Sequence, residues 1–145
     1  MQISPTDQLD ADIDYFAADA TGHILHVASG GGVLPESVAA DQEGLLALHQ
    51  YFLTLPEPAA GGALAAAEAV ETSYPGATRY ARRGLFSFAK TDLHAPSDPR
   101  YHLVARPLRP LTVAELPPEL AALLRRTLLP GSVVHQSTLD VSSIP

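Results

Sequence analysis

The chain has 145 residues, of which 46% are hydrophobic, and its formal net charge is −7. This length and apolar content allow a substantial core, so they exclude a disordered chain and predict one globular domain over residues 1–145. No stretch approaches the roughly 18 apolar residues of a membrane-spanning helix. The lack of cysteine excludes disulfides, thiolate metal sites and a cysteine nucleophile.

The start of the chain is polar and acidic. We expect residues 1–11 to form a loose lead-in, because Pro5 and scattered polar residues interrupt any regular pattern. The basic and apolar regions of a secretory signal are both missing. The start therefore predicts a cytoplasmic protein without a membrane partner.

Charge is unevenly distributed along the chain. Residues 1–78 contain eleven Asp and Glu and no Lys or Arg, whereas residues 79–145 contain nine Lys and Arg and five Asp and Glu. An acidic half suits the steering of a basic partner, although the two halves could also interleave and neutralise each other. The overall negative charge argues against a nucleic-acid partner.

The first regular element is a predicted hairpin. Ile13–Ala18 and His23–Ala28 both alternate in the manner of strands, and Asp19–Gly22 between them has the Asp and Gly of a tight turn. The second strand is expected to end at the glycines after Ser29, because holding consecutive glycines in an extended conformation costs conformational entropy.

Two helices are predicted next. Asp41 is placed to cap a helix over Gln42–Leu53. The apolar stripe of this helix consists of Leu45, Leu48, Phe52 and Leu55, widened by Leu46 and Leu53. Alanine is the best helix former, so its abundance predicts a second helix over Ala63–Thr72.

The second half of the chain predicts two strands, Gly84–Lys90 and Tyr101–Arg106, and then a third helix. Thr112 and Glu115 have capping-box spacing, and the following prolines restart the helix. The tail could end in a short strand. The chain therefore predicts an α+β domain: an antiparallel sheet of about four to five strands, beginning with the N-terminal hairpin, with about three helices packed on it.

The glycine corner, Ser29-Gly30-Gly31-Gly32, fails each catalytic template. A phosphate-binding P-loop needs a lysine, yet no Lys or Arg precedes Arg79. A dinucleotide fingerprint needs a third spaced glycine, and a nucleophile elbow needs glycine where Val27 stands. The corner is predicted to bend the backbone, with Gly30 and Gly31 as candidate partner contacts.

No metal or cofactor site is predicted. The six histidines show no metalloprotease or facial-triad spacing. His23 and His26 are three residues apart on a strand, so they point to opposite faces. A competing hypothesis places a small-molecule or hydrolase site at Ser29 and His26, with an aspartate of the first strand.

Two charged groups are candidate protein contacts. Asp10, Asp12 and Asp14 alternate and would line one face of a strand, where they could meet a basic partner or simply form a solvated edge. Arg82 and Arg83 precede a strand with two phenylalanines that we expect in the core. Arginine is enriched at protein interfaces.

Three stretches, "DIDYFAADATGHILHVASGGGVLPESV", "RRGLFSFAKTD" and "YHLVARPLRPL", together resemble a family of small bacterial proteins of the immunity-protein type. Members pair an acidic D-hydrophobic-D-aromatic-F opening with a glycine corner, LP-x-S and a GL-aromatic-S-F-x-KT element. These fall on Asp12–Phe16, Ser29–Gly31, Leu34–Ser37 and Gly84–Thr91. Members more often carry Trp where Tyr15 stands, and the alanine-rich insert at 59–69 has no counterpart.

The resemblance implies a protein that binds and blocks a toxin made by its own cell, and it brings no catalytic residue set and no cofactor. An acidic half would speed capture of a basic, nuclease-like toxin. Two rival interpretations remain. One is the small-molecule or hydrolase site at Ser29 and His26, and the other is a structural or regulatory subunit.

Overall fold

The computed structural model describes residues 3–4, 6, 13–29, 34–54, 67–69, 78–91, 98–107, 110–134, 136 and 138–144. Within these ranges seven strands form one sheet in the order β3-β5-β4-β2-β1-β6, with β7 also paired to β5. The strands are β1 (Asp14–Asp19), β2 (Ile24–Ala28), β3 (Ala67–Ala69), β4 (Phe86–Lys90), β5 (Arg100–Pro107), β6 (Leu128–Leu129) and β7 (Thr138–Asp140). The helices are α2 (Glu36–Ala39), α3 (Gln42–Thr54), α5 (Thr78–Ala81) and α6 (Pro118–Arg125), with 3-10 helices η1 (Val113–Glu115) and η2 (Val141–Ser143). No helix among these residues is long and apolar enough to cross a membrane.

The N-terminal hairpin is confirmed. β1 and β2 pair antiparallel, with Phe16 opposite His26. The turn places Gly22 at φ +89°, a backbone conformation that glycine adopts without steric cost. The Asp19 carboxylate accepts hydrogen bonds from the N–H groups of Thr21 and His23, so the turn is closed by its own aspartate.

The α+β class is confirmed, but the prediction of an antiparallel sheet with four to five strands is wrong. β2 pairs parallel to β4, and β1 pairs parallel to β6. A parallel neighbour must arrive by a crossover connection, so it leaves no turn signal between the paired segments. The strands that were not predicted, β3 and β6, have three and two residues, too few to show an alternating pattern.

The predicted helices have mixed outcomes. α3 matches its predicted range, and the Asp41 side chain caps it by accepting the Gly44 N–H at 2.9 Å. The helix predicted over Ala63–Thr72 is wrong where the structure describes it, because residues 67–69 form β3 against the edge of β5. Pairing with an open strand edge outweighs the helical propensity of alanine there. The rest of that range lies outside the described residues.

The third predicted helix divides in two. Val113–Glu115 is a 3-10 turn whose Glu115 carboxylate accepts the Thr112 N–H at 2.7 Å, and α6 begins afterwards with proline in its first turn. The tail strand is confirmed as β7.

Near the start of the chain, Ile3 is buried and donates its N–H to the Ala39 carbonyl.

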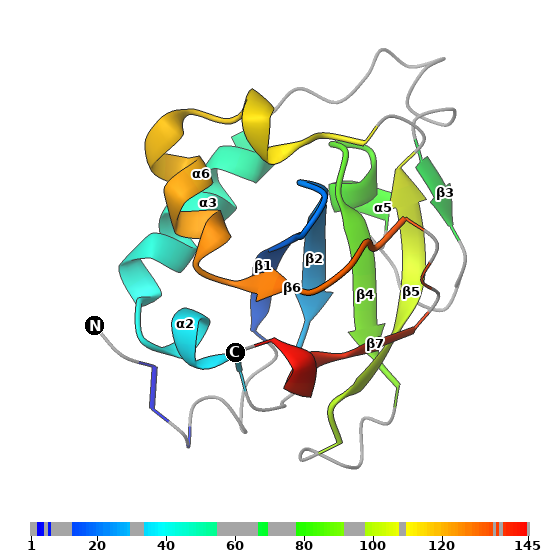
Figure 1. Ribbon diagram of the computed structural model, residues 1–145, viewed down its shortest axis with the longest axis horizontal. Helices are drawn as coiled ribbons and strands as arrows, with labels where there is room; N and C mark the ends of the chain where they lie inside the picture. The colour runs from blue at the N-terminus through cyan, green and yellow to red at the C-terminus, as the bar shows by residue number, and fades with distance from the viewer. Residues whose placement is uncertain are drawn as a thin grey trace.

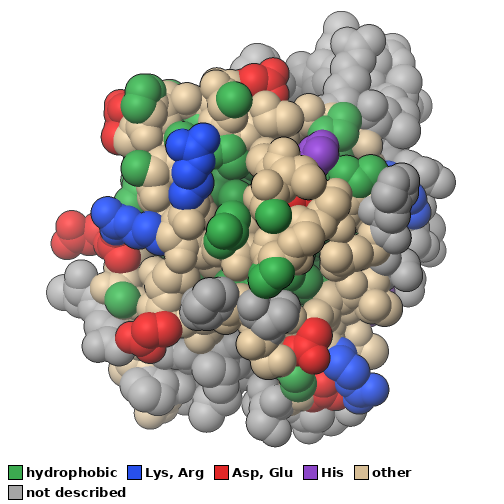
Figure 2. All heavy atoms as spheres, in the orientation of Figure 1, with side chains coloured by type: hydrophobic (Ala, Val, Ile, Leu, Met, Phe, Trp, Pro, Cys, Tyr) green, Lys and Arg blue, Asp and Glu red, His purple; other side chains and the backbone are tan. Residues whose placement is uncertain are grey.

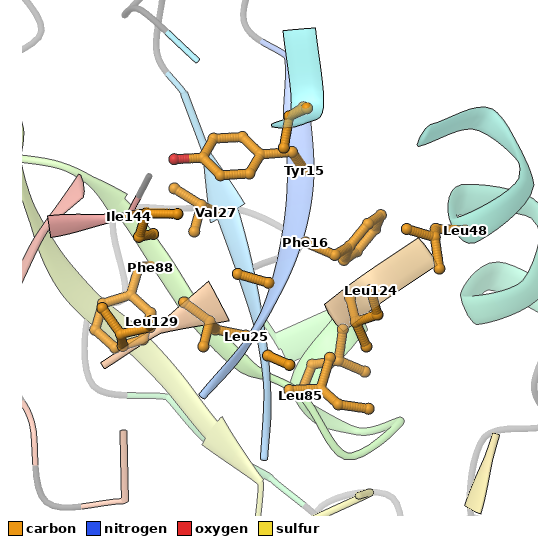
Figure 3. Packing of buried hydrophobic residues seen from close by; sticks show 14 of the residues in the cluster. Tyr15, Phe16, Leu25, Val27, Leu48, Leu85, Phe88, Leu124, Leu129 and Ile144 are labelled. Carbon is orange, nitrogen blue, oxygen red and sulfur yellow. The ribbon is translucent and has the colours of Figure 1, made fainter. Parts of the chain in front are cut away.

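The sheet is covered on both faces. Helices α3 and α6 lie on one side, while the C-terminal segment crosses the other from β6, beside β1, to β7, beside β5 (Figure 1). Figure 3 shows the two resulting layers, with side chains from adjacent positions on β1 pointing to opposite sides. One layer contains Phe16, Leu48, Leu85 and Leu124, and the other contains Tyr15, Val27, Phe88 and Ile144.

Candidate protein-binding surface

The outer face of helix α3 exposes two large apolar side chains. Leu46 is 52% exposed and Leu53 is 39% exposed. Positions 42, 43, 46, 50 and 53 fall on one side of a 3.6-residue helix, so the two leucines stand among Gln42, Glu43 and Gln50, which are also exposed. The expectation that Leu46 and Leu53 widen the buried stripe is therefore wrong. Their angular offset from Leu45, Leu48 and Phe52 on a helical wheel is the signal that identifies them.

The inner face of α3 is held firmly against the sheet. Leu45, Leu48 and Phe52 are buried, and the Phe52 ring centroid lies 4.8 Å from that of Phe16. His49 Nε2 lies 2.9 Å from the Asp14 carbonyl oxygen, which can only accept, so Nε2 carries the proton and donates it. The exposed leucines thus stand on an element whose position is fixed by packing and hydrogen bonding.

Helices α2 and α3 carry acidic side chains and no lysine or arginine. Glu36 and Glu43 are exposed, and no Lys or Arg occurs between residues 36 and 54. Asp41 is 3.3 Å from the guanidinium of Arg126, the residue that follows α6, so a base from the second half of the chain meets an acid from the first. Figure 2 shows acidic and basic side chains on one face of the molecule. The fold therefore offsets part of the charge asymmetry of the sequence.

The predicted contact residues lie on separate elements. Asp14 begins β1 with its carboxylate 3.2 Å from His26 Nε2, and Arg82 and Arg83 are half-buried after α5. Neither group lies on α3. The remaining predicted contacts, Asp10, Asp12, Gly30 and Gly31, lie outside the described residues.

A histidine, a serine and an aspartate meet inside the sheet. His26 Nδ1 is 2.9 Å from the Ser87 hydroxyl, Nε2 faces Asp14, and the ring stacks on Tyr80 with centroids 3.9 Å apart. These residue types could form a nucleophilic triad, but Ser87 is completely buried on the middle strand β4. A catalytic hydroxyl must reach a substrate. The arrangement therefore joins β1, β2 and β4 rather than presenting a nucleophile.

The predicted Ser29–His26 corner is not brought together. Ser29 is buried, and its hydroxyl accepts the Ile13 N–H at 2.8 Å. Its carbonyl accepts the Tyr101 hydroxyl at 2.9 Å. Since His26 engages Ser87 instead, the two side chains serve different contacts, and this geometry does not favour a hydrolase built on them.

The buried Tyr15 hydroxyl finds no hydrogen-bond partner among the residues that the structure describes. Burial, with a further contribution from nearby Tyr101, raises the pKa of the Tyr15 phenol well above its ordinary value. Replacing Tyr15 with phenylalanine is expected to leave the free energy of unfolding unchanged or to raise it by up to about 1 kcal/mol, because an unpaired polar group is removed.

The matched control is Tyr101→Phe, measured by the same urea unfolding experiment. It should lower the free energy of unfolding by about 1–2 kcal/mol, since it leaves the buried Ser29 carbonyl without the donor seen in the structure. Equal losses in the two variants would contradict the distinction between the hydroxyls.

The outer face of α3 is thus the candidate site, because it combines exposed apolar side chains with a rigid base. The buried polar clusters hold strands together. Comparison of the chain with protein-family models, with curated proteins and with solved structures finds no match.

Proposed function

We propose that this chain is a non-catalytic protein-binding domain, and specifically an immunity protein that binds and neutralises a toxin in the cytoplasm of the cell that makes both. The outer face of α3 is the proposed contact surface. The observation that carries the proposal is the exposure of Leu46 and Leu53 on one side of a helix whose other side is locked into the core.

Such a surface has the arrangement of a protein interface, with an apolar centre and a polar rim. A few well-packed residues near the centre of an interface supply most of the binding free energy, and the contacts around them exclude water. Here the leucines would form the centre, with Gln42, Glu43 and Gln50 around them. A helix already held in place loses little conformational entropy on binding, which favours affinity.

The proposed partner carries a basic contact surface. The α2–α3 region has exposed carboxylates and no Lys or Arg, and the whole chain has a charge of −7. Complementary charge raises the rate of association, which matters for a protein that must capture a toxin before it acts. Asp10, Asp12, Asp14, Gly30, Gly31, Arg82 and Arg83 remain proposed secondary contacts.

The test uses the toxin domain encoded by the reading frame beside the gene. Titration calorimetry should show stoichiometric binding, and the double variant Leu46→Gln, Leu53→Gln should raise Kd by about 100-fold, since central apolar contacts each contribute about 1–2 kcal/mol. The matched control is Leu128→Gln, which changes a leucine that is 42% exposed on β6 and should leave Kd within about threefold.

Two results would overturn the proposal. If the unmodified chain does not bind or inhibit that toxin, the immunity role fails. If native mass measurement shows a stable homo-oligomer that the double variant dissociates, the leucines join copies of this chain, and the structural-subunit interpretation replaces the immunity role.

A further inference from the structure

An open groove of about 640 Å³ lies where the first hairpin meets η1, α6 and β6. Its walls are residues 18–22, residues 112–114, Arg125 and Leu128. None of these residues belongs to α3, so the groove is separate from the proposed toxin-binding surface. Its volume lies within the range of about 300–1,000 Å³ that is common for binding sites.

Small apolar side chains line much of the groove. Ala18 and Ala20 line it at the end of β1, and Val113 lines it from η1. Asp19 lies between the two alanines, so in this extended backbone its side chain points to the opposite face. There the side chain is fully buried, and its carboxylate accepts the Val133 N–H at 2.7 Å. The negative charge of Asp19 is therefore directed away from the groove.

Arg125 provides a positive charge in the wall of the groove. It is the last residue of α6 and is exposed, and no residue within the described ranges forms a hydrogen bond or ion pair with its guanidinium. The next residue, Arg126, instead lies 3.3 Å from the Asp41 carboxylate. The N–H donors of Arg125 are therefore available to an anionic partner, for which a guanidinium provides charge-assisted hydrogen bonds.

Strand β6 offers an open edge beside the groove. It is the last strand at this end of the sheet, and Figure 1 shows α6 leading into it. Leu128 pairs with Ala18 in parallel, and the Ala18 N–H donates to the Thr127 carbonyl at 3.0 Å. In a parallel ladder this arrangement directs the N–H and C=O of Leu128 away from β1. Among the described strands none pairs with that side of β6.

The Leu128 side chain joins this edge to the groove. It is 42% exposed and lines the groove, whereas the next side chain, Leu129, is buried. Figure 2 shows basic and hydrophobic side chains close together over α6 and β6. A peptide strand added to β6 would place alternate side chains on the same face as Leu128. An apolar side chain on that face would contact Leu128, and an acidic one would reach Arg125.

We propose that β6 and the groove bind an extended peptide segment of a partner protein, in which an acidic side chain stands among apolar ones. The segment adds to β6 as a strand, its acidic side chain pairs with Arg125, and an apolar side chain packs against Leu128. A helix would leave the open N–H and C=O of Leu128 unused, because it pairs its own backbone groups. This surface goes beyond toxin binding, since it uses other elements and the opposite charge.

The test titrates the full chain with a short, end-capped peptide of valine and threonine that has one central glutamate, and follows amide chemical shifts. Saturable shifts at Ala20, Arg125 and Leu128 are expected, with Kd of about 1 mM. The affinity is low because Pro130 has no N–H, so the edge offers few backbone hydrogen bonds.

Two control peptides separate the charge from the strand pairing. One has glutamine in place of glutamate, and the other is N-methylated throughout its central residues, so that it cannot pair as a strand. Each should bind at least about fivefold more weakly. No saturable shift with the glutamate peptide, or equal binding by either control peptide, would overturn the proposal.

The role of Arg125 is tested by a matched pair of variants. Arg125→Gln should weaken binding of the glutamate peptide by about fivefold, because it removes the ion pair. Arg126→Gln loses the same charge at the neighbouring exposed residue, which pairs with Asp41, and should leave Kd within about twofold. The charge-swapped Arg125→Glu variant should prefer a peptide with lysine in place of glutamate. A folded Arg125→Gln variant with unchanged Kd overturns the proposal.

Leucine variants separate this surface from the outer face of α3. Leu128→Gln should weaken peptide binding by about fivefold, whereas the double variant Leu46→Gln, Leu53→Gln should leave it unchanged. Circular dichroism verifies that these variants are folded. If the double variant weakens peptide binding and Leu128→Gln does not, the peptide lies on α3 and the proposal fails. These measurements contain no toxin, so their outcome is independent of the immunity role.

Discussion

Replacing Asp19 with alanine is expected to lower the free energy of unfolding by about 3 kcal/mol or more. Asp19 is only 2% exposed. One carboxylate oxygen accepts from the Thr21 N–H, the Thr21 hydroxyl and the His23 N–H, and the other accepts the Val133 N–H at 2.7 Å. The substitution leaves these donors without the acceptor. It also removes a link between the first hairpin and the C-terminal segment that covers the sheet.

The measurement is urea unfolding followed by circular dichroism. Asp140→Ala is the matched control, because Asp140 also accepts a backbone N–H two residues ahead, that of Ser142, but is exposed. Water can replace that acceptor, so the control should lose only about 1 kcal/mol. Similar losses in the two variants would show that the buried position of Asp19 adds nothing.

Replacing Phe16 with alanine is expected to lower the free energy of unfolding by about 3–5 kcal/mol. Phe16 is almost fully buried on β1 beneath α3. Its ring centroid lies 4.8 Å from Phe52, 5.0 Å from His49, 5.6 Å from Tyr80 and 5.8 Å from His26. Truncation removes aromatic contacts to three elements at once and leaves a cavity that the surrounding rings can fill only in part.

Two further variants show whether the loss of unfolding free energy comes from the burial of Phe16 or from any substitution to leucine or alanine. Phe16→Leu retains most of the volume and should lose about 1–1.5 kcal/mol, whereas Leu46→Ala, on the exposed face of α3, should change stability by less than about 0.5 kcal/mol. Thermal and urea unfolding provide independent values. A loss below about 2 kcal/mol for Phe16→Ala would contradict its central place in the core.

The sequence indicates the candidate surface only in part. The wheel positions of Leu46 and Leu53 differ from those of the buried leucines, but a stripe of any width can be covered by a neighbouring element. Only the packing of α3 against α6 and the sheet decides which of its leucines are buried and which are exposed. Lys90 shares the strand period of Phe86 and Phe88, which predicts that its side chain points inward. A cavity beside it, however, is formed by residues from distant parts of the chain.

Local sequence accounts for the features whose causes lie within a few residues. The β1–β2 hairpin depends on Asp19 and Gly22 in its own turn, and α3 depends on Asp41 and a local apolar period. Long-range contacts account for the parallel pairings, the strand at 67–69 and the C-terminal segment over the sheet. These arise from hydrogen-bonding edges and apolar faces supplied by distant parts of the chain, and no local pattern records which distant segment will meet them.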